Sequence, residues 1–438
     1  MKKSLIFWAV LLCAVLPGCS KKEAASGKVT IVVGGWPSAD VGFKAALAGF
    51  NEKYPNINVE IEMSETSAYH QALQTALAAG QGAPDVAMIE GAYIAQYRDS
   101  KALVNLLGAP YNANRYKNDF VGLKWNQAYS SDGQRMVAFS WDIGPSTYFY
   151  RQDIFKEVGL PTDPEEVAQL AGTWDGLLEV AKKVHIPGKR WLLPEAHIVY
   201  QEFFHNRDFF DEKLNLLLDR PGDIECLNTV IEMRKSGLDM GVDMWATEAY
   251  AAFDNGALVS VITGAWYGGF LKDDVDPDGT GNWRAAYLPG GIRDKSIGGS
   301  FCAIPEQSKH KEEAWAFLEY MLATKKGQND MFEAIDYFPS YVPAWDDPIY
   351  EAADPYFGGQ KTRSLWKNMA NGLDVPVYTT IMDTTVETQM RTSIYEGIEK
   401  GLDAQGIKAL IREQVGTATA ELRRQQIQTL RDAGVWKD

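Results

Sequence analysis

The chain has 438 residues and a formal net charge of −15, with 43 Lys and Arg against 58 Asp and Glu. This acidic balance makes nucleic acid a poor partner, because phosphate binding needs clustered basic charge. The length allows roughly two or three domains. Beyond the N-terminus there is no run of about eighteen uncharged apolar residues, so we expect a soluble body without a membrane span.

The N-terminus has the order of a secretory signal. A basic start precedes an apolar run from Leu5 to Leu16, and small residues follow. The run is too short to span a bilayer comfortably. The segment Leu16-Pro17-Gly18-Cys19 resembles the lipobox of bacterial lipoproteins, although Pro17 departs from the usual pattern. The resemblance implies that residues 1–18 are a signal peptide and that Cys19 carries a lipid such as palmitate; the alternative is an ordinary signal peptide and an unmodified Cys19.

Residues 19–27 are small and polar and show no apolar periodicity. Such a segment cannot bury enough apolar surface to fold. We therefore expect a lipidated, flexible tether that holds the folded body at an extracytoplasmic membrane surface.

Two further cysteines, Cys226 and Cys302, belong to the folded body. An oxidising compartment would allow them to pair. They fall in a predicted helix and a predicted strand that are far apart in the sequence, so two buried free thiols are the favoured interpretation.

From Lys28 onward, short strands alternate with helices. The pattern predicts strands over 29–33, 58–63 and 85–89, and helices over 43–53 and 68–79. This alternation indicates crossover units on a mostly parallel sheet, the arrangement of α/β proteins. In such sheets, ligands bind outside the carboxyl ends of the strands.

The loops at these strand ends carry the side chains of a polar-solute site. Trp36, Ser38 and Asp40 follow the first strand, and Glu90 follows the third. An aromatic ring, carboxylates and hydroxyls together suit a sugar. Each polar residue has another interpretation: Ser38 and Asp40 suit a helix N-cap, which is the favoured role of Asp40, and Glu90 suits a surface salt bridge.

A second lobe is predicted to begin after a strand over 136–141. The pattern then predicts strands over 147–151, 257–262, 283–288 and 301–304, and helices over 174–184, 223–235, 247–254 and 312–322. Thr173 suits the N-cap of the first of these helices. Residues 185–222 are expected to be less regular, and the tail over 405–433 is expected to be helical and amphipathic.

The sequence offers no catalytic or metal-binding motif. It contains no G-x-S-x-G, H-E-x-x-H or G-x-x-x-x-G-K-[ST], and its 5 histidines are scattered. The run from Asp274 to Gly279 matches the first half of a calcium loop, but Ala285 stands where a bidentate Glu is needed. We therefore expect an acidic surface turn, no metal and no cofactor. A binding protein is favoured, and a secreted glycoside hydrolase or lyase is the enzyme alternative.

Several segments match, in order and spacing, the motifs of a known family. The pair Trp141-Asp142 precedes the strand Tyr148-Phe149-Tyr150-Arg151-Gln152-Asp153-Ile154-Phe155, in which Arg151 and Gln152 depart from the usual Asn-Lys. The other matching segments are Phe50 to Val59, Leu77 to Gly80, Ala83 to Val86, Gly159 to Pro161, Thr173-Trp174, Phe253 to Leu258, Gly264 to Trp266 and Gly298 to Ile304. Together they resemble the family 1 extracellular solute-binding proteins, the maltose- and trehalose-binding group of ABC importers.

This resemblance implies an α/β fold of two lobes, the periplasmic-binding-protein fold, with hinge crossings and a ligand cleft between the lobes. The N-terminal lobe would comprise residues 28–141 plus about 300–343, and the C-terminal lobe residues 142–299 plus about 344–438. Ligand binding stabilises a closed state that a membrane complex distinguishes from the empty one. The implied partners are a carbohydrate and the permease subunits of an ABC importer, and the implied state is a monomer.

The resemblance also implies a set of ligand-binding residues. Asp142 would accept hydrogen bonds from sugar hydroxyls, and Trp266 would be a stacking platform. The backbone amides of Gly298, Gly299 and Ser300 would donate to ligand oxygens.

Loop placement adds Trp141 and Tyr267 as candidates, although most large rings in a protein are buried for their area. Asp142 has an alternative role as a turn residue near the crossing. We expect Trp266→Ala or Asp142→Ala to weaken ligand binding by about 1 to 3 kcal/mol each and to leave the fold intact.

The class of solute is open to alternatives. A polyol phosphate would recruit Arg or Lys together with helix N-terminal amides, whereas the candidate loops are acidic and aromatic. This composition favours a neutral oligosaccharide and leaves a polyamine as the alternative. The identity, length and linkage of the sugar depend on which loop side chains meet across the two lobes.

Overall fold

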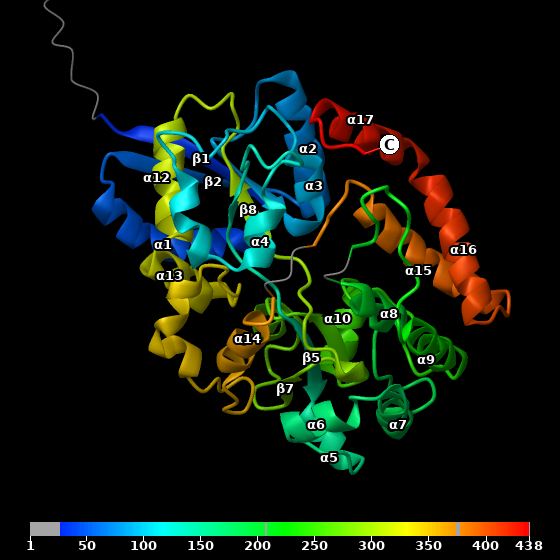
Figure 1. Cartoon of the computed structure of the whole chain (residues 1–438). Coiled ribbons are helices and arrows are strands. Elements are labelled where there is room, and N and C mark those ends of the chain that lie inside the picture. Colours follow the sequence, from blue (N-terminus) through cyan, green and yellow to red (C-terminus); the bar gives the residue numbers. More distant parts are fainter. Residues whose placement is uncertain (1–26, 206–207, 374–376, 438) are drawn as a thin grey trace, which may run out of the picture.

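The computed structural model describes residues 27–205, 208–373 and 377–437 and shows a mixed α/β molecule with one sheet in each of two lobes (Figure 1). The predicted α/β class and two-lobed architecture are confirmed. The predicted signal peptide and Cys19 lie outside the described residues. Within the described part of the chain, no helix is long and apolar enough to cross a membrane.

The sheet of the first lobe has five strands in the order β2 (Ile57–Met63), β1 (Val29–Gly35), β3 (Val86–Glu90), β8 (Ser300–Ala303) and β4 (Phe139–Ser140). β1 runs parallel to β2 and β3, as the alternation of strands and helices predicts. β8 returns from the second lobe and pairs antiparallel with β3 and β4. The carboxyl ends of β1 and β3 therefore meet the amino end of β8 at one edge of the sheet.

Helices α1 (Ala39–Lys53), α12 (Lys311–Leu322) and α13 (Lys325–Ile335) pack together, and α12 also packs on β1 and β4. Phe43 of α1 anchors this layer, since its ring stacks on Trp141 with centroids 4.6 Å apart. The remaining long helix of the lobe, α2 (Thr66–Ala79), is capped by the Glu65 carboxylate. These helices leave the edge described above uncovered for the second lobe.

The sheet of the second lobe has three strands in the order β6 (Ser260–Gly264), β5 (Ser146–Arg151) and β7 (Trp283–Ala286), all antiparallel. The parallel pairing of the first lobe does not extend to it. Thr173 Oγ1 accepts from the Gly176 amide at 3.1 Å, which confirms the predicted cap. The helices of this lobe are α5 (Gln152–Glu157), α6 (Pro164–Leu170), α7 (Trp174–Val184), α8 (His197–Phe204), α9 (Asp223–Lys235) and α10 (Thr247–Asp254).

Three extended segments run side by side between the two sheets. Asp142 forms a bridge with Pro339, and Pro145 forms one with Ser296. Few backbone dihedrals separate the lobes at these points, which is the geometry of a hinge.

The C-terminal part of the chain forms α14 (Thr362–Ala370), α15 (Asp383–Glu399), α16 (Ala404–Ala418) and α17 (Ala420–Asp432). α15 packs on α8, α9 and α16, and the three last helices follow one side of the molecule (Figure 1). The amphipathic tail predicted as one helical segment is two helices that meet at Thr419, whose hydroxyl bonds to Val415 O at 2.7 Å.

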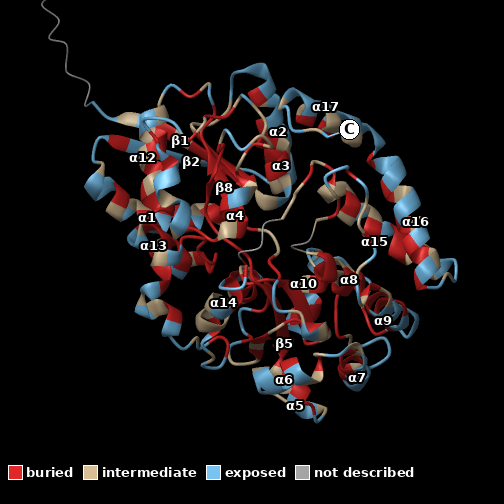
Figure 2. Cartoon of the chain, in the orientation of Figure 1, coloured by how far each residue is buried: buried red, intermediate tan, exposed pale blue. Residues whose placement is uncertain are grey.

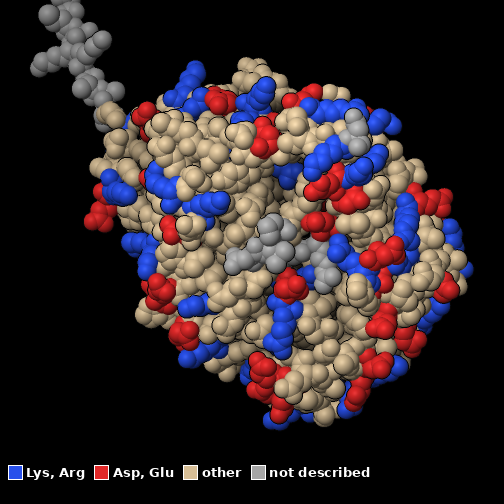
Figure 3. Space-filling view, viewed as in Figure 1, with Lys and Arg blue, Asp and Glu red and all other residues tan. Residues whose placement is uncertain are grey.

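Buried residues concentrate on the strands and on the inward faces of the helices (Figure 2). Cys226 on α9 and Cys302 on β8 are both buried and free. On the face shown in Figure 3, acidic and basic residues are interspersed.

The acidic run from Asp274 to Gly279 is not the simple surface turn that the sequence predicts. Asp276 is 2% exposed and accepts from Trp283 Nε1 at 2.8 Å. Its carboxylate also lies 3.4 Å from Arg151 Nη1. The prediction is wrong for Asp276 because a buried guanidinium and an indole N–H satisfy its charge.

Candidate functional site

A cleft between the lobes contains two adjoining cavities. The first has a volume of about 700 Å³ and is lined by residues of the strand ends, the crossings and the second lobe, among them Trp36, Ser38, Glu65, Thr66, Glu90, Asp142, Trp245, Tyr250, Trp266, Phe270, Gly298, Gly299, Ser300 and Tyr337. The second, of about 300 Å³, lies between the first lobe and the helices α8 and α15. Both cavities are lined by Glu90, Trp245, Trp266 and Gly298, so they adjoin at these residues, and their volumes are of the order that small molecules occupy.

Two tryptophans of the second lobe form the apolar wall of the first cavity. The rings of Trp245 and Trp266 are parallel within 7°, with centroids 5.8 Å apart. Trp266 Nε1 donates to Ile297 O at 3.1 Å, which fixes the orientation of the ring. Trp245 is 50% exposed. An exposed ring held in place by its neighbour is a platform for the apolar face of a ligand.

A stack of three rings on the first lobe supports the opposite wall. His70 lies between Trp36 and Tyr93, with centroid distances of 5.5 and 4.1 Å. His70 Nε2 accepts from the Glu90 amide at 3.2 Å, so the ring proton is on Nδ1, which faces Thr66 O at 2.8 Å. Burial lowers the pKa of His70, which keeps the ring neutral. The stack therefore holds Trp36 and Glu90 at the carboxyl ends of β1 and β3.

Two buried groups of opposite charge lie close together behind the crossing that precedes β8. Asp142 and Lys124 of α4 (Gly122–Gln127) are each 2% exposed. Asp142 Oδ1 accepts from the Ser300 amide at 2.7 Å, and Lys124 Nζ donates to Gly298 O at 2.6 Å. Burial lowers the pKa of Lys124 to about 8 and raises that of Asp142, while each charge favours the other. The pair thus braces the wall of the cleft from inside.

At the centre of this crossing is a glycine that no residue with a side chain could replace without strain. Gly299 has φ 82°, a conformation that residues with a side chain rarely adopt. A Cβ there would lie 2.6 Å from Asp142 O and 2.7 Å from Lys124 Cε. The close approach of the buried pair therefore depends on glycine.

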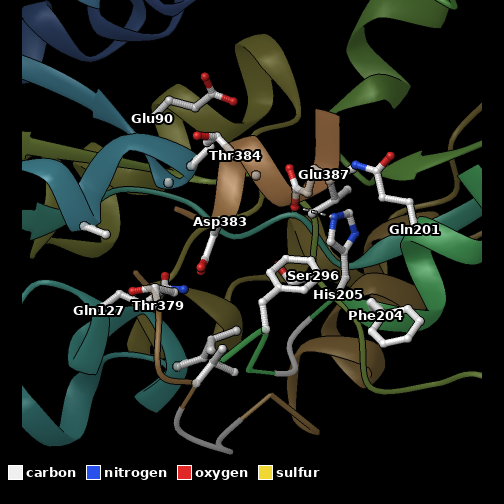
Figure 4. A pocket seen from close by; sticks show the side chains of 18 of the residues that line it. Glu90, Gln127, Gln201, Phe204, His205, Ser296, Thr379, Asp383, Thr384 and Glu387 are labelled. Carbon is white, nitrogen blue, oxygen red and sulfur yellow. Dashed lines mark ion pairs between the residues drawn. The ribbon is translucent and has the colours of Figure 1, made fainter. Parts of the chain in front are cut away.

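Carboxyl groups gather in the second cavity (Figure 4). Asp383 and Glu387 lie one turn apart on α15, and Glu90 reaches the same cavity from the first lobe. Burial raises the pKa of Asp383 to about 7, although Thr380 donates to it through its amide and its hydroxyl. Burial, and then the charge of Glu387, raises the pKa of Glu90 to about 7. The cavity therefore presents acidic groups that both donate and accept hydrogen bonds near neutral pH.

The family model of the bacterial extracellular solute-binding proteins matches residues 35–328, which include the strands from β2 to β8 and the cleft residues Trp36, Glu90, Trp245 and Trp266. The chain is a bacterial extracellular solute-binding protein. The predicted family is confirmed, and its members act outside the cytoplasm as binding proteins.

Relatives of this solute-binding protein match over most of its length. The arabinooligosaccharide-binding protein of Halalkalibacterium halodurans is 26% identical over 381 residues, or 81% of each chain. The lactose-binding protein of Rhizobium radiobacter is also 26% identical and covers 93% of this chain and 94% of its own.

Solved structures share the two-lobed fold. A family 1 extracellular solute-binding protein superimposes with a TM-score of 0.75 at 22% identity, over 89% of this chain and 99% of its own. The ABC transporter-associated binding protein of B. animalis subsp. lactis, solved with β-1,6-galactobiose, superimposes with a TM-score of 0.72 at 22% identity, over 90% of this chain and 98% of its own.

The structure brings eight of the predicted ligand residues to the cleft, namely Trp36, Ser38, Glu90, Asp142, Trp266, Gly298, Gly299 and Ser300. It does not bring Asp40, Trp141 or Tyr267. Asp40 lies in the first turn of α1 and pairs with Lys44 at 2.6 Å. Trp141 and Tyr267 are fully buried, because each ring packs against other aromatic rings inside the protein.

In two of these eight residues, the group that was expected to bind the ligand has an internal partner instead. The Ser300 amide donates to Asp142, so it is not available to donate to a ligand as the sequence predicts. Asp142 in turn is a buried partner of Lys124 rather than an open acceptor. The amides of Gly298 and Gly299 stay predictions as ligand donors.

Sequence reasoning missed most of the second wall. Trp245, Tyr250 and Phe270 line the first cavity, and α8, which lies in the stretch expected to be irregular, supplies Gln201 to the second. An apolar spacing over the residues of α8 was the available signal, since Val199, Tyr200, Phe203 and Phe204 are buried. The contribution of α15 has no local signal, because it depends on contacts between distant segments.

The raised pKa of Glu90 predicts that this carboxyl group lowers the stability of the fold by an amount that depends on pH. A carboxyl whose pKa is about 7 when folded and near its usual value when unfolded destabilises the fold as pH rises between these values. Glu90→Gln should therefore gain stability over the parent from pH 5 to pH 8, as measured by denaturant titration. Glu399→Gln, at the exposed end of α15, is the control, and a constant difference across this range would contradict the prediction.

Proposed function

We propose that this solute-binding protein binds a neutral oligosaccharide in the cleft and delivers it to an ABC importer by closure of the lobes. The observation that carries this proposal is the parallel pair Trp245 and Trp266 facing the strand-end residues Trp36 and Glu90 across one cavity. A sugar ring offers apolar C–H faces and a rim of hydroxyls. Aromatic planes suit the first and carboxyl groups suit the second.

The site is large enough for a ligand that is bigger than a single small polar group. The two cavities of about 700 and 300 Å³ adjoin at Trp245, Trp266 and Gly298. Ligand pockets of this size hold drug-sized molecules. We therefore propose an oligosaccharide rather than an ion or a monosaccharide.

The named relatives support the same class of ligand. They are an arabinooligosaccharide-binding protein and a lactose-binding protein, and one structural neighbour was solved with β-1,6-galactobiose. The residues of this cleft do not decide between these sugars. The proposal therefore covers neutral saccharides as a class.

Delivery and attachment complete the proposal. Closure about the three crossings would give the importer a shape that distinguishes the loaded protein from the empty one. The lobes would comprise residues 28–141 with about 300–343, and 142–299 with about 344–438. A lipid on Cys19 would hold a monomer at the outer side of the membrane.

A panel titration tests the function. Arabinotriose, lactose, galactobiose, maltose, spermidine and a polyol phosphate would each be titrated into the protein by calorimetry, and the products would be analysed after long incubation. We expect binding of at least one neutral saccharide without turnover. Tight binding of spermidine alone would show that the site binds a polyamine, for which the carboxyl groups of Glu90, Asp383 and Glu387 in its lining would be suitable partners. Accumulation of cleavage products would instead make the protein an enzyme.

A further inference from the structure

One histidine in the wall of the second cavity lies between two carboxylates. His205 Nδ1 is 3.0 Å from Glu202 Oε1, and His205 Nε2 is 3.3 Å from Glu387 Oε1. Figure 4 shows the side chain of His205 directed at Glu387. A neutral imidazole has a single N–H and can donate to only one partner. The geometry therefore corresponds to an imidazolium that donates to both.

The surroundings of the ring favour its positive charge. His205 follows the last residue of α8, where the helix end carries partial negative charge. Burial acts to lower the pKa of His205, but Glu202 and Glu387 outweigh it and raise the pKa to about 10. The ring therefore stays charged throughout the physiological range.

The two carboxylates differ in what they can reach. The Glu202 side chain is 2% exposed and is enclosed in the lobe. The Glu387 side chain is 29% exposed and lines the second cavity. Since a carboxylate has room for several donors, Glu387 can bind His205 and still accept from a ligand.

We propose that His205 is a positioning residue that fixes Glu387 as a charged acceptor for the hydroxyl groups of the bound saccharide. The inference rests on the proposed function. It assigns the α8 and α15 junction a role in affinity, because an acceptor that is already held loses less side-chain entropy on binding. It also narrows the ligand to one with hydroxyl donors at this end, since a carboxylated sugar would meet the carboxylate of Glu387.

The first test needs no ligand. Nitrogen NMR of the whole chain would follow the His205 ring through a pH titration, with the His205→Gln variant used for assignment. We expect a charged ring at pH 8. In Glu202→Gln, which removes one carboxylate and keeps the side-chain shape, the titration should move toward neutral pH. A ring that is neutral at pH 8 in the parent would overturn the proposal.

The second test measures binding of arabinotriose and of lactose by calorimetry. His205→Gln and Glu387→Gln should each lower the affinity for the sugar by about tenfold, as expected for loss of a charge-assisted contact. The double variant should lose no more than Glu387→Gln alone, because both changes act through one group. His310→Gln, in the first lobe before α12, is the matched control and should bind as the parent does.

The pH profile separates positioning from a purely structural role. Relative to the parent, the Glu202→Gln variant should lose sugar affinity as pH rises from 6 to 8.5. In this variant the His205 ring loses its proton over that range, and with it the charge that holds Glu387. Glu90 and Asp383 titrate in both proteins, so the ratio of affinities isolates His205. Full affinity in His205→Gln beside weakened binding in Glu387→Gln would overturn the proposal. A parent that binds none of the four saccharides of the panel would contradict the proposed function instead, and the NMR titration would then decide the role of His205.

Discussion

Replacing Asp142 with alanine should lower the free energy of unfolding by about 3 to 5 kcal/mol, because the change leaves a buried lysine without its counter-charge. Asp142 and Lys124 are each 2% exposed, and the Asp142 carboxylate also accepts from the Ser300 amide at 2.7 Å. The variant therefore loses the nearby carboxylate whose charge favours protonated Lys124, and it leaves a buried amide without its acceptor. This prediction replaces the expectation from sequence that Asp142→Ala leaves the fold intact.

Urea denaturation at pH 7 measures the effect. Asp40→Ala is the matched control, because Asp40 pairs with Lys44 at the surface, where such pairs contribute only about 0.3–0.5 kcal/mol. The double variant Asp142→Asn with Lys124→Met should recover part of the lost free energy of unfolding. The Lys124→Met change removes the buried positive charge that no longer has a carboxylate beside it. A loss below about 1 kcal/mol in Asp142→Ala would show that Lys124 finds water or another partner.

Removal of the Trp266 ring should cost about 2 to 3 kcal/mol of ligand binding, or roughly 30- to 150-fold in affinity. The ring is held by the Ile297 carbonyl and stacks on Trp245, so alanine removes one platform and frees the other. Trp245→Ala should act in the same direction. Trp245→Phe should retain most of the affinity because a planar ring stays in place.

Calorimetry with a saccharide identified by the panel measures this loss, and thermal unfolding checks that each variant is folded. Ile186→Ala removes an exposed apolar side chain in the second lobe outside the cleft and should change nothing. Affinity within about threefold of the parent in both Trp245→Ala and Trp266→Ala would show that the aromatic wall takes no part in binding.

The predicted elements show where local sequence is sufficient. The helices over 174–184, 223–235 and 247–254 have the predicted bounds. The buried apolar residues of each helix recur within a few residues of each other, and Thr173 also caps the first of the three, so the signal for these helices is local. The strand over 136–141 is shorter than predicted: Phe139–Ser140 pairs with the distant β8, and Met136 forms a separate bridge with Tyr129.

The candidate site divides in the same way. Residues at strand ends, such as Trp36 and Glu90, were predictable because parallel strands place their carboxyl ends together. Trp141 and Tyr267 were expected there on the same grounds of loop placement, but both rings are buried. A large ring near a loop packs inside as readily as it lines a cleft, and the choice depends on which segment covers it.

By itself, the sequence determined the family, the α/β alternation of the first lobe and the acidic, aromatic character of its strand-end loops, since all of these lie in short contiguous segments. Only the tertiary structure decided that the charges of Lys124 and Asp142 lie close together and that Trp245 stacks on Trp266. It also decided that His205 and Glu387 meet in one cavity. Each of these contacts joins residues that are far apart in the sequence, and the energy of a charge or a ring depends on such neighbours.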